Sequence, residues 1–146
     1  MSSSIVLDAS FITSMITAQP TTEIAQSLWS EWRAQEARFH APSLLLLEVG
    51  TGLRKYVVGG LVSQERADTA LLVFETLVQD IALAPLSALL SEAWEIASRY
   101  RLMNLYDASY VALADKLECD IWTVDARMRR AMPGHAQKIR VISPAA

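Results

Sequence analysis

The chain has little cysteine and no long hydrophobic run. Cys119 is its only cysteine, so no disulfide can form within the chain. No Lys or Arg precedes the first apolar stretch at the N-terminus, where a secretory signal would carry positive charge. A membrane-spanning helix needs about 20 consecutive apolar residues, whereas runs such as 44–47 are short and soon interrupted by charge. These absences argue against a secreted or membrane protein, and we expect a cytoplasmic location.

The composition is that of a single folded domain. The chain has 146 residues, of which 52% are hydrophobic and 20% are charged. This balance lies outside the low-hydropathy, high-charge range of disordered chains. By the usual surface scaling, a chain of this mass buries about two-thirds of its surface on folding. We therefore expect one domain over residues 1–146, with a core large enough to be stable without disulfides.

The charge of the chain is unevenly distributed. Its net charge of −3 argues against binding to nucleic-acid phosphates. Residues 1–98, however, carry a balance of −6, whereas residues 99–146 carry +3. In the basic segment Arg127, Arg129 and Arg130 form a cluster that is a candidate for phosphate contacts. On charge alone, a solvated surface explains the same cluster equally well.

Apolar periodicity predicts alternating strands and helices. Strands are expected over 5–7, 39–41, 81–84, 121–124 and 139–142. Helices are expected over 10–19, 22–37, 44–57, 63–78, 87–100 and 106–117. No two-residue hairpin signal joins the strands, so their connections are predicted to be crossovers. The expected fold class is α/β, a doubly wound, mainly parallel five-stranded sheet flanked by helices.

Four carboxylates interrupt apolar sequence and need an explanation. Asp8 and Asp125 each follow a predicted strand, while Glu48 and Asp107 stand near the start of predicted helices. In a doubly wound sheet, ligands bind outside the carboxyl ends of the strands. Burying a lone carboxylate is costly unless it finds a cation or a proton. We therefore expect the four side chains to meet in one cleft at that edge.

Each acid also has a structural interpretation. Asp8 and Asp125 could cap the helices that follow them, and Asp107 could interact with the positive end of a helix dipole. Glu48 could pair with a buried arginine such as Arg54. If these roles are the whole explanation, the chain is a non-catalytic protein-binding module.

Converging carboxylates point to a hard divalent cation. All-oxygen ligation favours Mg²⁺ or Mn²⁺ over zinc, and neither His40 nor His135 has a ligand-spaced partner. Such an ion activates water and stabilises charge during phosphodiester hydrolysis. Ser10 and Thr123, each two residues from an acid, are candidates for supporting hydrogen bonds. An aspartyl-phosphate phosphotransfer domain is an alternative, although no second aspartate lies two residues after Asp8.

The order of these fragments resembles the PIN-domain ribonucleases, and among them the VapC-type toxins of toxin–antitoxin modules. The resemblance covers the chain nearly from end to end. It is carried by Leu7-Asp8-Ala9-Ser10, Ala41-Pro42-Ser43, Leu47-Glu48-Val49, the segment 106–114 and Thr123-Val124-Asp125. One departure is Met103-Asn104-Leu105, which stands where a glycine-containing loop is expected.

The resemblance implies a PIN-like fold and a metal-dependent endoribonuclease. Asp8, Glu48, Asp107 and Asp125 would form the catalytic quartet, with Asp8 and Asp107 binding Mg²⁺ or Mn²⁺ most directly. Ser10 and Thr123 would support them. It also implies an RNA substrate such as tRNA or rRNA, a homodimer, and an antitoxin that inserts a segment near the cleft. The turn 56–62 would contribute to antitoxin and dimer contacts, with core packing as the alternative for Val57 and Leu61.

Overall fold

The fold is a five-stranded parallel sheet with β1 at its centre. The computed structural model describes residues 3–144. All neighbouring strands are parallel, and their order is β3-β2-β1-β4-β5. The strands are β1 (Ser4–Leu7), β2 (Arg38–Pro42), β3 (Ile81–Ala84), β4 (Asp120–Thr123) and β5 (Ile139–Val141). The predicted fold class is confirmed, and the predicted strand ends differ from the observed ones by at most one residue.

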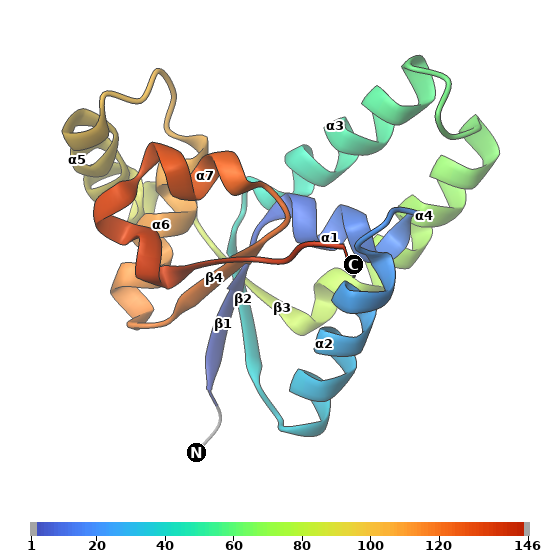
Figure 1. The fold of residues 1–146 in the computed structure, drawn as a ribbon, viewed down its shortest axis with the longest axis horizontal. Coiled ribbons are helices and arrows are strands. Elements are labelled where there is room, and N and C mark those ends of the chain that lie inside the picture. Colours follow the sequence, from blue (N-terminus) through green and yellow to red (C-terminus); the bar gives the residue numbers. More distant parts are fainter. Residues whose placement is uncertain (1–2, 145–146) are drawn as a thin grey trace.

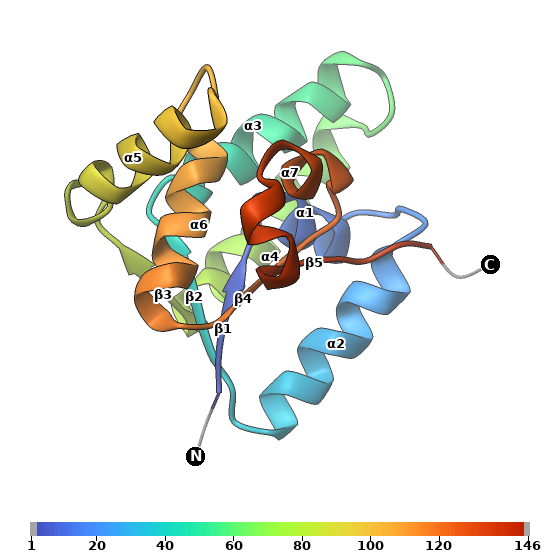
Figure 2. The same ribbon diagram turned by 60° about the vertical axis from the view of Figure 1, so that its left-hand side comes forward.

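Helices cover both faces of this sheet. On one side lie α5 and α6, and on the other lie α1 and α2, as two views of the ribbon show (Figures 1 and 2). Helices α3 and α4 form a hairpin beside α1 (Figure 1). The bounds are α1 (Ala9–Ile16), α2 (Thr22–Ala34), α3 (Leu45–Val58), α4 (Gln64–Leu77), α5 (Leu90–Tyr100), α6 (Tyr106–Leu117) and α7 (Ala126–Ala131). No helix of this described part is long and apolar enough to cross a bilayer.

The core extends over both faces of the sheet, and one part of it forms where the apolar faces of α1 and α2 meet the sheet. Trp32 of α2 is 8% exposed, and its ring lies 5.6 Å from the ring of Phe11 and 5.1 Å from that of Trp122. Trp29, one turn earlier, stacks on Phe39 of β2 with ring centroids 4.1 Å apart. These aromatic pairs add to the free energy of burying apolar area. They fix α2 against the strands that carry the site.

Local signals explain where some of the helices begin and end. The Ser63 side chain accepts a hydrogen bond from the Arg66 N–H at 3.1 Å and caps α4. Gly59 ends α3, and Gly60 takes a left-handed φ of 75°, which glycine adopts without strain. The prediction that α2 runs to Ala37 is wrong, because Glu36 turns the chain into β2 with a positive φ of 59°.

The segment before α6 lacks glycine, as the sequence showed. Its turn is made instead by Asn104, whose Oδ1 accepts a hydrogen bond from the Tyr106 N–H at 3.1 Å. Asparagine side chains commonly satisfy backbone donors in this way. Helix α6 therefore starts at Tyr106, with Asp107 in its first turn.

Candidate active site

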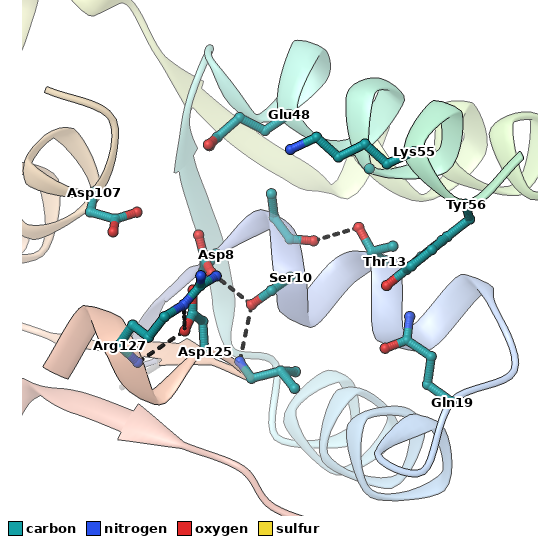
Figure 3. Close-up of a pocket in the computed structure, with 13 residues that line it drawn as sticks. Asp8, Ser10, Thr13, Gln19, Glu48, Lys55, Tyr56, Asp107, Asp125 and Arg127 are labelled. Carbon is teal, nitrogen blue, oxygen red and sulfur yellow. Dashed lines mark hydrogen bonds and ion pairs between the residues drawn. The ribbon is translucent and has the colours of Figure 1, made fainter. Parts of the chain in front are cut away.

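All four predicted acids line one open cavity of about 500 Å³. Asp8 follows β1 and Asp125 follows β4, so both lie at the carboxyl edge of the sheet. Glu48 and Asp107 enter from the first turns of α3 and α6. Figure 3 shows the four acids around the same space. The structure thus brings together side chains that lie up to 117 residues apart in the sequence.

Asp8 forms the floor of the cavity and is 6% exposed. Its Oδ2 accepts hydrogen bonds from the Ser10 hydroxyl at 2.7 Å and the Thr123 hydroxyl at 2.8 Å. The two hydroxyls are themselves fixed, because Ser10 Oγ accepts from the Val124 N–H and Thr123 Oγ1 from the Asp125 N–H, both at 3.0 Å. Ser10 and Thr123 therefore hold Asp8 in one orientation. Asp8 stands at the N-cap position of α1, as its structural interpretation suggested, but its side chain makes no capping hydrogen bond.

Burial raises the pKa of Asp8, and the two hydroxyl donors only partly oppose this effect. The carboxylate has no cationic side chain paired with it among residues 3–144. A buried acid without a counter-ion is typical of sites that bind a ligand of opposite charge.

Glu48 is held by a buried tyrosine. The Tyr110 hydroxyl donates to Glu48 Oε1 at 2.7 Å, and the tyrosine side chain has no exposed surface. Burial, together with the charges of Asp8 and Asp107, raises the pKa of Glu48 to about 6 despite this hydrogen bond. The suggested pairing with Arg54 is wrong, because that guanidinium donates to Gln64 Oε1 at 2.9 Å.

Asp107 and Asp125 differ although they face the same cavity. Burial and the charges of Asp8 and Asp125 raise the pKa of Asp107 to about 6. The pKa of Asp125 is lowered, because its side chain accepts hydrogen bonds from Arg127. Arg127 Nε and Nη2 each lie 2.9 Å from an Asp125 carboxylate oxygen. Asp125 also accepts the Arg127 N–H at 2.9 Å, so it caps α7 as predicted.

The basic segment reaches the cavity through one residue. Arg127 lines the cavity, whereas Arg129 and Arg130 lie exposed on α7 outside its lining. Further along the chain, Lys138 pairs with Asp115 at 2.8 Å and Arg140 pairs with Asp120 at 3.0 Å. Internal carboxylates therefore neutralise part of the positive charge that the sequence places in this region.

The cavity is also lined by residues to which the sequence analysis gave no role in the site. Lys55 and Tyr56 follow Glu48 by seven and eight residues, a helical spacing that brings them to the same face of α3. Their place beside Glu48 could therefore have been predicted from the sequence. Gln19 comes from the loop between α1 and α2, and Tyr110 contacts Glu48 across 62 residues, so neither had a local signal. Within the turn 56–62, Leu61 is 77% exposed, so core packing is wrong for that residue.

The chemical type of the donor atoms fits a hard cation. Oxygen is the ligand that Mg²⁺ and Mn²⁺ prefer, and four carboxylates provide it around this cavity. Within residues 3–144, no three acidic, His or Cys side chains lie close enough together to enclose a metal ion. Mg²⁺ is commonly held by one or two carboxylates and completes its shell with water and substrate phosphate. A partly formed set at the cavity wall suits that mode of binding.

Comparisons with known proteins agree on one family. The family model for the PIN domain matches residues 5–132. Ribonuclease VapC1 of Mycobacterium tuberculosis is 33% identical over 108 residues, which cover 74% of this chain and 77% of that protein. Ribonuclease VapC3 of Pyrobaculum aerophilum is 28% identical over 129 residues, covering 88% and 95%. Among solved structures, a toxin–antitoxin complex from Klebsiella pneumoniae aligns with a TM-score of 0.64 at 15% identity, covering 97% and 98%.

Proposed function

The chain belongs to the PIN-domain family, among its VapC-type ribonucleases, and on that premise we propose that it is a metal-dependent endoribonuclease acting as a toxin. The observation that carries the metal and site assignment is the acidic cavity, in which Asp8, Glu48 and Asp107 have no ion pair within residues 3–144. Two of its carboxyls, Glu48 and Asp107, have a pKa of about 6 because burial and neighbouring acids disfavour their charged forms. A divalent cation relieves that repulsion, which gives the site affinity for metal.

Asp8 and Asp107 are the residues that would hold Mg²⁺ or Mn²⁺. The ion would supply an activated water and stabilise the charge that develops on the scissile phosphate. Asp8 presents its second oxygen, Oδ1, because Ser10 and Thr123 both bind Oδ2. Fixed orientation of a ligand by such hydrogen bonds strengthens metal binding.

Glu48 is placed to accept a proton. Its Oε1 accepts the Tyr110 hydrogen bond, which leaves Oε2 available to accept a proton from the reacting water. A carboxylate with a pKa of about 6 is a more effective base near neutral pH than an ordinary glutamate. Asp125 has a different role in this proposal, since it fixes Arg127 at the rim, where the guanidinium can meet an RNA phosphate.

The substrate in this proposal is a structured RNA such as tRNA or rRNA. Arg127, Arg129 and Arg130 are exposed on one short helix at the edge of the cavity and provide the phosphate contacts. An aspartyl phosphate at Asp8 is not favoured, because this side chain is 6% exposed and one of its oxygens already accepts two hydrogen bonds.

The proposed protein partners are an antitoxin and a second copy of the chain. Val58 and Leu61 at the tip of the α3–α4 hairpin are 78% and 77% exposed and offer an apolar surface for the antitoxin. On α5 and in the turn before it, Leu86, Leu90 and Trp94 are 44%, 59% and 66% exposed and offer one for the homodimer.

Induced expression of wild type and Asp8→Asn, followed by assay of the purified proteins on total RNA with Mn²⁺, tests the function. Wild type should arrest bacterial growth and produce discrete RNA fragments, and the variant should do neither. Asp68→Asn is the matched control, because it removes an exposed acid of α4 that lies outside the cavity. Cleavage by Asp8→Asn at the wild-type rate would exclude the proposed mechanism. A binding module would show equal growth arrest with both proteins and intact RNA.

A further inference from the structure

The cavity extends beyond the acids to a second, uncharged end. Thr13, Gln19 and Tyr56 line this end, and Lys55 lies between it and Glu48. In Figure 3, Tyr56 and Gln19 extend toward one another at the end far from Asp107 and Arg127. Phosphodiester hydrolysis does not need these groups. Their chemistry differs from that of the acids and calls for a separate role.

The shape of this end follows from the cavity face of α3. Glu48, Gly52, Lys55 and Tyr56 share that face at helical spacing. Gly52 has no side chain, so a trough stays open between the acids and Tyr56. A Cβ at this position would already lie 3.6 Å from Thr13 Oγ1, and a longer side chain would fill the trough.

Gln19 is oriented before any ligand binds. Its backbone N–H donates to Thr22 Oγ1 at 2.8 Å, and its Nε2 donates to Thr17 Oγ1 at 2.6 Å. Within residues 3–144, its Oε1 receives no hydrogen bond. A fixed amide with a free acceptor at a cavity wall is suited to reading a donor on a ligand.

Tyr56 and Lys55 supply the other two contacts. Tyr56 is half-buried in the cavity wall, so its ring is held in place while remaining accessible. Lys55 is exposed and has no ion pair in the described part of the chain. Its amino group points back toward Glu48 (Figure 3). The cation therefore stands between the acids and the aromatic ring.

We propose that this end of the cavity is a subsite for one unstacked base of the RNA substrate. The base stacks on Tyr56, an amino or imino N–H on its edge donates to Gln19 Oε1, and Lys55 contacts a phosphate between this base and the scissile bond. Aromatic stacking combined with hydrogen bonds to the base edge is a general mode of reading single-stranded RNA. The inference rests on the proposed ribonuclease function and adds a source of sequence preference to it.

Cleavage of a randomised RNA library, with sequencing of the cut sites, tests the subsite. Wild type should show a base preference at one position near the cut. Gln19→Ala should flatten that preference while cleavage continues. The matched control is Gln35→Ala, which removes an exposed glutamine amide at the end of α2, outside the cavity. A preference in Gln19→Ala that equals that of wild type would overturn the role of Gln19.

Two Tyr56 variants separate stacking from bulk. Tyr56→Leu should weaken binding of a 12-nucleotide single-stranded RNA by about tenfold, and Tyr56→Phe, which keeps the aromatic face, should bind it nearly as wild type does. Binding is measured by fluorescence anisotropy on the Asp8→Asn background, where the RNA is not cut. An equal loss in both variants would overturn the stacking role. If wild type cleaves no RNA, the proposed function itself is wrong. If wild type cleaves RNA but the Gln19 and Tyr56 variants keep its base preference and its RNA affinity, only the subsite is wrong.

Discussion

The two ends of α6 carry aspartates whose environments are opposite. Asp107 lies in the first turn, where the helix dipole favours a negative charge, yet its pKa is raised to about 6. Asp115 lies in the last turn, where the dipole disfavours a negative charge, yet its pKa is lowered. Burial at Asp107 and neighbouring side chains at both ends therefore outweigh the dipole.

The partners of the two aspartates explain the contrast. Burial alone would raise the pKa of Asp115, but hydrogen bonds from Lys138 and His135 outweigh it. His135 Nε2 donates to Asp115 Oδ2 at 2.9 Å, and its Nδ1 lies 2.8 Å from the Tyr100 hydroxyl. Asp107 instead has its pKa raised first by burial and then by the charges of Asp8 and Asp125. A balanced polar cluster stabilises the fold, whereas an unbalanced one marks a binding site.

The largest expected effect comes from a substitution in the acidic cluster that Asp107 faces. Asp8→Asn should reduce RNA cleavage by more than about a hundredfold, since loss of an outer-shell partner alone costs about 10- to 100-fold. The same variant should melt at a higher temperature than metal-free wild type, because a buried charge is removed while an acceptor for Ser10 and Thr123 remains. Paired cleavage assays and thermal melts measure both effects. A large loss of stability in this variant would instead mean that Asp8 stabilises the fold, as Asp115 does.

A substitution in the polar cluster around Asp115 should lower stability and leave RNA cleavage unchanged. His135→Ala should lower the free energy of unfolding by about 3 kcal/mol, because it opens a cavity and removes the partner of the Tyr100 hydroxyl and of Asp115 Oδ2, while Lys138 still binds Oδ1. Cleavage per folded molecule should be retained. Denaturant unfolding followed by the RNA assay tests this separation.

Gly134→Ala is a milder probe of the same cluster. Its Cβ would lie 2.3 Å from the Tyr100 hydroxyl oxygen, so the tyrosine must move away from His135. Stability equal to that of wild type would show that this cluster contributes little to the fold.

Stabilisation by added metal should depend on Asp107 and not on Asp115. Mg²⁺ or Mn²⁺ at about 100 times its Kd should stabilise wild type by about 2.7 kcal/mol, through preferential binding to the folded state. Asp107→Asn should lose most of that stabilisation, and Asp115→Asn should keep it. Calorimetric titration and thermal melts provide the measurement. Equal stabilisation of both variants would mean that the metal binds elsewhere.

The smallest expected effect is on the pH dependence of stability at the two ends of α6, because partial solvent exposure screens these charges. Glu48 and Asp107 have a raised pKa, so the folded metal-free protein binds their protons more tightly than the unfolded chain does. Stability from these groups is present below the ordinary pKa values of 4.5 and 3.8 and is lost as the pH rises through about 6.

Asp115 has the opposite sign. Its pKa is lowered, so its contribution is present above 3.8 and is lost as the pH falls through the folded-state pKa. Urea unfolding of metal-free wild type, Asp107→Asn and Asp115→Asn from about pH 3 to about pH 7 measures both slopes. Asp107→Asn should reduce the decline toward neutral pH. Asp115→Asn should reduce the decline in acid.

Local and periodic features of the fold were predictable from the sequence, and contacts between distant side chains were not. Helix α6 begins and ends at the predicted residues, and Asp125 caps α7 as its position suggested. Parallel strands place their carboxyl ends at one edge of the sheet, so the position of Asp8 and Asp125 at that edge followed from the fold class. Their proximity depends on the pairing of β1 with β4, which the sequence did not predict. The bond between Tyr110 and Glu48 depends on how α3 and α6 pack, and no spacing rule specifies that packing.

The position of β1 at the centre of the sheet has a consequence during synthesis. The residues that complete the floor around Asp8 belong to β4 and the turn after it, more than 110 residues downstream. A ribosome that is still making the chain therefore carries Asp8 without Thr123, Asp107 or Asp125 in place. The acidic site assembles only after residues through Asp125 have emerged, so the ribosome is not exposed to a finished site while the preceding residues are being made.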